Sequence, residues 1–246
     1  MIAYMTFNPL GLGLFYLAYV AFLREDTFFQ RNRGLLLAGL ATTAVLPLGP
    51  WLWSIVVVVE EIPTFVVQAQ AGVAAVRSHS AGLDAALAGR LLWWGYLLIA
   101  SALLLRAARQ AVRLTAFALS RHPERGDGYY LVRTGGRWPT FAFGPFVFWD
   151  DTAVLAPAEQ ALVLAHEAAH VRQRHTWDLL AVEALRALLW FNPFVHLCRA
   201  ALVEQHEYLA DAAVTRRATA TAYGALIARQ TLVGAQLTLL THAFNH

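Results

Sequence analysis

Residues 166–170 read His-Glu-Ala-Ala-His and lie in an apolar, alanine-rich run (161–171) that favours a helix. Histidines four residues apart lie one turn apart on one helix face, so the imidazoles of His166 and His170 can reach one metal ion. Glu167 lies between them, where its carboxylate can accept a proton from water held by the metal. The motif is typical of a zinc hydrolase with two histidine ligands and a glutamate base.

A third ligand is needed, because a hydrolytic zinc site usually has three protein ligands and one open position for water. Residues 207–211 read Glu-Tyr-Leu-Ala-Asp, which places two carboxylates on one helix face. We expect Glu207 to be the third ligand and Asp211 to accept the distal N–H of a zinc-bound histidine. Glu204 and His206 are rival ligands, and a solvated acidic helix face is the alternative interpretation.

His175 is not expected to be a metal ligand, and contact with a ligand stays open as an alternative. It follows His170 by five residues, which is about 140° around a continuing helix. It therefore leaves the face that carries His166 and His170, and a surface or helix-terminal role is the simpler prediction.

The composition indicates a membrane protein. Of 246 residues, 58% are hydrophobic and only 14% are charged, whereas soluble domains have roughly 45–50% and about 25%. Two charge-free runs in the N-terminal half exceed the roughly 20 residues that cross a bilayer, and a third run is shorter. We expect transmembrane helices at about 1–23, 34–59 and 88–108. The alternative for each is a buried helix of a large soluble protein.

The distribution of arginines predicts the orientation of these spans. Several arginines follow the first and third spans, whereas the connection between the second and third carries only Arg77 before Arg90. By the positive-inside rule, the N-terminus is external and the chain after the third span is cytoplasmic. The sequence is therefore divided into a transmembrane region, 1–113, and a cytoplasmic zinc domain, 114–246.

The second half of the chain changes to short strand and helix patterns. Strands are expected at 129–133, 140–143 and 146–149, with Gly144-Pro145 as a turn between the last two. We expect this small sheet to pack on the zinc-motif helix, and its edge could also pair with an extended substrate. Helices are expected at about 157–173, 176–190 and 194–215, the last with Asn192 as its cap.

The net charge limits which partners are expected, and the cysteine content limits which covalent links, metal sites and compartments are expected. The net charge is +3, and much of the basic excess lies beside the predicted spans, where it can meet anionic lipid. No basic stripe is interleaved with aromatic residues, so a nucleic-acid partner is not expected. Cys198 is the only cysteine, which excludes an intrachain disulfide and a multi-thiolate metal site and suits a reducing cytosol.

The chain resembles the BlaR/MecR-type membrane metallopeptidases of bacteria over three stretches, 166–173, 190–193 and 206–211. The resemblance implies a gluzincin-like cytoplasmic domain after the third span, in a bacterial inner membrane. It implies the same roles for the same residues: His166, His170 and Glu207 as ligands, Glu167 as base and Asp211 behind a ligand. Family members usually continue into a fourth span and often an extracellular sensor. Sensing of β-lactams would rest on that sensor region, so this role is not carried over from the family to this chain.

Together these features predict a mostly α membrane protein, with about three transmembrane helices and a gluzincin-like cytoplasmic zinc domain that contains a small β-sheet. The expected function is a membrane-embedded zinc endopeptidase that acts in signal transduction. Its expected partners are the lipid bilayer and a protein substrate, either a regulator or the chain itself. Two alternatives stay open: a non-catalytic signalling component with a structural zinc site, and a membrane scaffold without metal.

Overall fold

The computed structural model describes residues 2–45, 78–216 and 223–225, which are mostly helical with one small mixed sheet. The helices are α1 (Ile2–Phe22), α2 (Phe29–Val45), α4 (Ser78–Ser120), α5 (Pro157–Arg172), α6 (His175–Leu188) and α7 (Pro193–Thr215). The strands are β1 (Glu124–Arg125), β2 (Tyr130–Arg133), β3 (Phe141–Phe143) and β4 (Phe146–Trp149). The predicted strands and helices between 129 and 215 are confirmed to within two residues at each end, and β1 is an addition to them.

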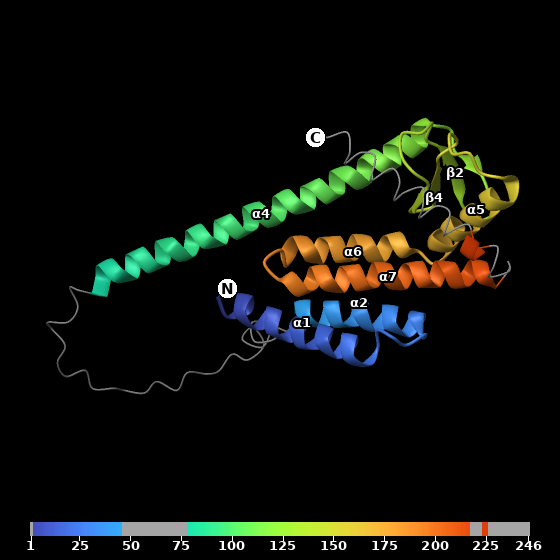
Figure 1. Ribbon diagram of the computed structural model, residues 1–246. Coiled ribbons are helices and arrows are strands. Elements are labelled where there is room, and N and C mark those ends of the chain that lie inside the picture. Colours follow the sequence, from blue (N-terminus) through green and yellow to red (C-terminus); the bar gives the residue numbers. More distant parts are fainter. Residues whose placement is uncertain (1, 46–77, 217–222, 226–246) are drawn as a thin grey trace, which may run out of the picture.

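Two helical hairpins, α1–α2 and α6–α7, form the larger part of the fold. Figure 1 shows α1 and α2 alongside α7, and α6 between α7 and the long helix α4. The shared core is aliphatic, with Leu12, Leu36, Leu40 and Leu202 all fully buried. Burying a leucine side chain stabilises a fold by roughly 1.5–3 kcal/mol, so this core holds the two hairpins against each other.

Buried asparagines fix the two ends of this helical core. The side-chain oxygen of Asn192, Oδ1, caps α7 by accepting the Phe194 N–H at 2.9 Å, as predicted. The side-chain nitrogen of Asn192, Nδ2, donates to Asn8 Oδ1 at 2.8 Å. At the other end of α1, the side chain of Asn32 donates to the Leu23 carbonyl at 2.8 Å. Asn192 joins the start of α7 to α1, and Asn32 joins α2 to the start of the turn that follows α1. These hydrogen bonds fix how the helices are aligned along their length.

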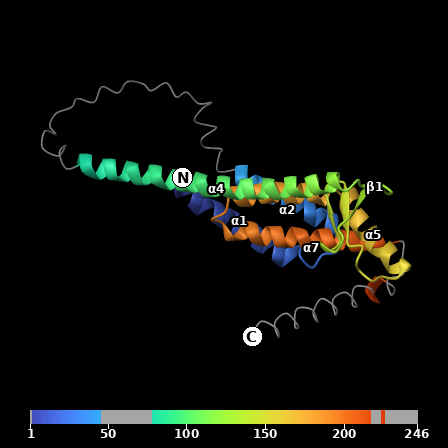
Figure 2. The same ribbon diagram turned by 90° about the horizontal axis from the view of Figure 1, so that it is seen from above.

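Helix α4 is long and apolar enough to cross a membrane over Leu87–Ser120, and no other helix in the described part of the chain meets that criterion. Only 6% of its most apolar window is buried inside the protein, and its N-terminal part extends beyond both hairpins (Figures 1 and 2). Leu98 is 73% exposed. A buried helix of a soluble protein would not show such a surface.

The predicted third span, 88–108, lies within α4. The first and second predicted spans stay predictions. The first coincides with α1, which contains only a shorter apolar helix, Asn8–Phe22. Residues 46–59 of the second lie outside the described residues. The structure therefore supports one membrane-spanning helix by length and composition.

The sheet packs on the C-terminal end of α4 and has the strand order β1-β2-β4-β3. β4 is buried, with β2 parallel on one side and β3 antiparallel on the other. Phe148 stacks on Phe141 with ring centroids 4.7 Å apart, and Phe117 of α4 packs near it. Gly144 has φ 58°, a left-handed conformation that suits glycine in the predicted turn. This order leaves β3 as an edge strand beside α5.

Candidate metal centre

Helices α5 and α7 supply the candidate ligands. Pro157 begins α5, where the missing N–H leaves no hydrogen bond unmade, and the Glu159 carboxylate accepts the Ala156 N–H at 2.9 Å. At the other end of α5, the Gln173 side chain donates to the Leu209 carbonyl of α7 at 3.3 Å. The two helices are thus held together close to His170 and Glu207.

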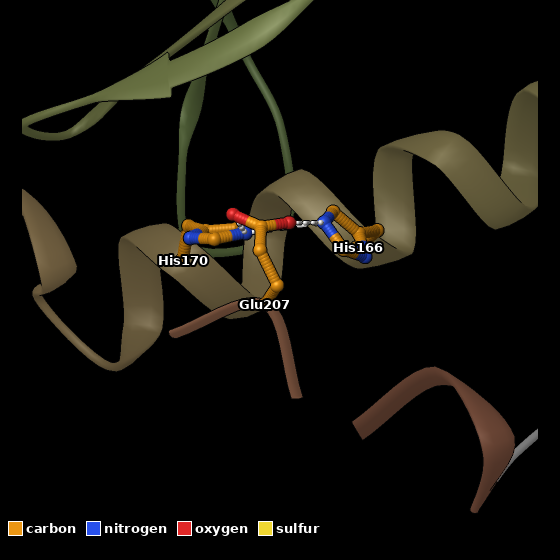
Figure 3. A group of neighbouring side chains, drawn as sticks. All are labelled: His166, His170 and Glu207. Carbon is orange, nitrogen blue, oxygen red and sulfur yellow. Dashed lines mark hydrogen bonds and ion pairs between the residues drawn. The ribbon is translucent and has the colours of Figure 1, made fainter. Parts of the chain in front are cut away.

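Three donor atoms face one point between these helices, as Figure 3 shows. The Nε2 atoms of His166 and His170 are 3.1 Å apart, and the two Glu207 carboxylate oxygens lie 3.3 and 3.7 Å from them. A tetrahedral zinc ion with bonds of roughly 2.0–2.1 Å needs neighbouring donors about 3.3–3.4 Å apart. The residues therefore fit zinc, and the half-exposed Glu207 side chain (51%) leaves one side accessible.

The distal nitrogen of His166 faces Asp211, where the sequence prediction placed it. His166 Nδ1 lies 3.1 Å from Asp211 Oδ1 and 2.7 Å from the hydroxyl oxygen of Tyr223, whose O–H donates to the same Asp211 oxygen at 2.7 Å. Tyr223 is not among the predicted site residues, because it lies beyond α7 and belongs to no motif. These contacts hold the ring of His166 with Nε2 towards the other two ligands.

A surface role for His175 is wrong, because this residue is buried (2% exposed). It lies at the start of α6 and contacts a ligand, which was the alternative. Its Nδ1 lies 2.9 Å from Nδ1 of His170. The prediction assumed one continuous helix, but α5 ends at Arg172 and Arg174 adopts a left-handed conformation, φ 57°. The chain therefore turns after α5, and this turn places His175, the first residue of α6, against His170.

The two rival ligands have other partners. His206 stacks on His175 with ring centroids 4.0 Å apart, and its Nε2 lies 2.9 Å from Asp178 Oδ2. Glu204 accepts a hydrogen bond from the Tyr208 hydroxyl at 2.9 Å and pairs loosely with Arg24 at 3.9 Å. Neither side chain belongs to the group of donors that could share one ion.

Glu167 lies beside the edge of the sheet. Burial raises the pKa of its carboxyl, and the backbone of Ala142 in β3 is among the groups that oppose this rise. In the turn after β3, the N–H of Gly144 donates to the Thr176 hydroxyl at 2.9 Å. The edge strand β3 therefore borders the ligand group.

Burial and the surrounding carboxylates set the charges of the site. Burial lowers the pKa of His166, but hydrogen bonds with Asp211 and Glu207 outweigh it and raise that pKa to about 9. Burial lowers the pKa of His170 to about 4, and the hydrogen bond with His166 is the main cause of the lowered pKa of Glu207. A proton on His166 and a metal ion therefore compete for the same donors.

Comparison with known families agrees with this geometry. Residues 146–242 match the family model described as BlaR1 peptidase M56, a segment that includes the five predicted site residues. No curated protein matches the chain. The match supports a metallopeptidase, and together with the apolar helix α4 it indicates a membrane protein. This segment carries His166, His170 and Glu207, and its match supports assignment to the BlaR1-type M56 peptidase family.

Proposed function

We propose that the protein is a membrane-embedded zinc-dependent endopeptidase that cleaves a cytoplasmic or membrane-proximal protein in signal transduction. One observation carries the proposal: donor atoms of His166, His170 and Glu207 lie 3.1–3.7 Å apart, close to the spacing around a tetrahedral zinc ion, with Glu167 beside them. A structural zinc site usually has four protein ligands and needs no base. Three donors with a neighbouring carboxylate therefore favour a hydrolytic site over a structural one.

Each residue would have a distinct part in peptide hydrolysis. Zinc, when bound, supplies a Lewis acid that polarises the scissile carbonyl and acidifies a water molecule. Glu167 would take the proton of that water and return it to the leaving amine. Burial raises the pKa of the Glu167 carboxyl, and the positive charge of His166 opposes this rise. A raised pKa makes the carboxylate a better proton acceptor near neutral pH.

The position of the basic residues supports a cytoplasmic site in an inner membrane. Arg33, just after the turn between α1 and α2, donates to the Gln173 carbonyl at the end of α5 at 2.9 Å. The arginine-rich turn and the metal-binding helix therefore lie at the same end of the molecule. Since arginines mark the cytoplasmic side, the proposed protease would act there on a regulator or on a second region of its own chain.

The test compares three versions of the full-length protein in membranes: wild type, Glu167→Gln and Glu204→Gln. Glu204→Gln is the matched control, since it removes a carboxylate outside the ligand group. We expect Glu167→Gln to bind zinc as wild type does but to lose proteolysis by at least roughly 100-fold. Protein fragments that disappear only in this variant, from the proteome or from the chain itself, identify the substrate. Undiminished fragments with zinc in place would refute the proposal.

A further inference from the structure

Arg33 lies outside the ligand group, yet a continuous series of contacts joins it to His170. We infer that Arg33 is a positioning residue for the metal site. Arg33 couples the α1–α2 hairpin to the ligands His170 and Glu207, and the contacts between them run through Asp178, His206 and His175. The inference rests on the proposed function, because it assumes that the three ligands bind zinc. It adds a means by which the N-terminal hairpin influences that site.

The first step joins three helices at one guanidinium group. Arg33 Nε donates to Asp178 Oδ2 in the first turn of α6 at 2.6 Å, and Nη2 donates to the Gln173 carbonyl at the end of α5 at 2.9 Å. The Arg33 side chain is only 13% exposed. A guanidinium has a rigid, planar set of donors, so it fixes both partners at once. A cation at the C-terminus of α5 also complements the helix dipole.

The second step leads from Asp178 to both ligand-bearing helices. The Asp178 oxygen that accepts from Arg33 also lies 2.9 Å from His206 Nε2. His206 directly precedes Glu207 on α7, so its hydrogen bond fixes the rotation of the helix at the third ligand. The His206 ring also stacks on His175 with an angle of 6° between the planes. The stacked His175 then contacts His170 at 2.9 Å.

Burial makes these contacts interdependent. His175 and His206 are each 2% exposed, and Asp178 is 14% exposed. If Arg33 is removed, the Asp178 carboxylate loses its cation in a largely dry environment and must move to find another partner. This movement weakens its hold on His206, and the displacement then reaches both His175 and Glu207. Changes in residues that support metal ligands weaken metal affinity by roughly 10–100-fold.

Arg31 provides the matched control, because it lies on the same helical turn, is itself exposed, and pairs with Asp26 instead of the network. The variants are Arg33→Gln, Arg33→Lys, Asp178→Asn and Arg31→Gln of the full-length protein. Zinc affinity is measured by competition with a chelator, and the thermal midpoint of metal-free protein monitors folding. The absorption spectrum of Co²⁺-substituted protein reports the ligand geometry independently of any catalytic activity.

We expect Arg33→Gln to weaken zinc binding by roughly 10-fold or more and to alter the Co²⁺ spectrum. Arg33→Lys should restore part of the affinity, since it keeps the charge beside Asp178 but not both hydrogen bonds. Wild-type affinity and spectra in folded Arg33→Gln, or in Asp178→Asn if the former does not fold, would overturn the inference. An equal loss in Arg31→Gln would do so too. Failure of wild type to bind zinc would instead refute the proposed function.

Discussion

The imidazoles of His170 and His175 face each other, with their Nδ1 atoms 2.9 Å apart. If Nε2 of His170 binds a metal ion, its Nδ1 carries the hydrogen and donates it to His175. Burial lowers the pKa of His175 to about 2, so this ring is a neutral acceptor. Asp211, in contrast, places a carboxylate behind His166. The two histidine ligands are therefore supported unequally, since a charged acceptor forms the stronger hydrogen bond.

Replacing His175 by alanine is expected to weaken zinc binding by roughly 10-fold, because His170 loses the acceptor that orients its ring. Competition with a chelator measures the change. His196→Ala is the control, since His196 is exposed and its ring accepts a hydrogen bond from Arg186, away from the ligand group. Zinc affinities that are equal in the two variants would show that His175 has no orienting role.

Much of the candidate site follows from spacing along helices. His166 and His170 lie on one turn of α5, and Glu207 and Asp211 lie on one turn of α7, as their four-residue separations predict. The start of α7 also follows from local chemistry, because Asn192 and Pro193 form a cap that needs no tertiary contact. Such features depend on neighbours in the sequence, which is why the sequence alone predicts them.

The residues that support the ligands could not be found in this way. His175 enters the site because Arg174 adopts a left-handed conformation, which the sequence marks with no glycine or asparagine. Arg33 reaches Asp178 across 145 positions of the chain. Tyr223 lies beyond α7 and reaches the site through tertiary contacts with Asp211 and His166. These contacts are set by the packing of helices, and periodicity carries no information about which helices meet.

Replacing Tyr223 by phenylalanine tests whether the segment after α7 stabilises the site. The hydroxyl donates to Asp211 and contacts His166, and its side chain is buried (6% exposed). We expect a loss of about 1.5 kcal/mol in the free energy of unfolding, the low end for a bond to a charged group, because Asp211 is partly exposed. Tyr208→Phe is the control, since that exposed tyrosine donates to Glu204, which lies outside the ligand group. A larger loss in the control would contradict this interpretation.

Replacing Asn192 by alanine should destabilise the helical core without changing the ligand group. The variant loses the cap of α7, which costs about 0.5–2 kcal/mol, and it leaves Asn8 Oδ1 buried without a donor, which costs about 1–3 kcal/mol. Thermal unfolding should therefore begin several degrees lower, while zinc affinity of the folded protein stays at the wild-type value. A wild-type melting temperature would show that this asparagine pair contributes no stability.

Burial of Cys198 predicts that ionisation of its thiol makes the stability of the protein depend on pH. The side chain is fully buried in the helical core, and burial raises the pKa of its thiol to about 12. The unfolded chain ionises near the ordinary thiol pKa of about 8.5, whereas the folded protein keeps its proton. The stability from this group is therefore fully present below about pH 8.5 and is lost as the pH rises towards 12.

Two measurements check this prediction for Cys198. Iodoacetamide should alkylate the folded protein far more slowly than the denatured protein at about pH 8.5, because only the thiolate is the nucleophile. The alkaline decline of the thermal midpoint should also be shallower in Cys198→Ala than in wild type, since the variant has no thiol to ionise. Rapid alkylation of folded protein would place Cys198 at an accessible position, which contradicts the packing of α7 against α1 and α2.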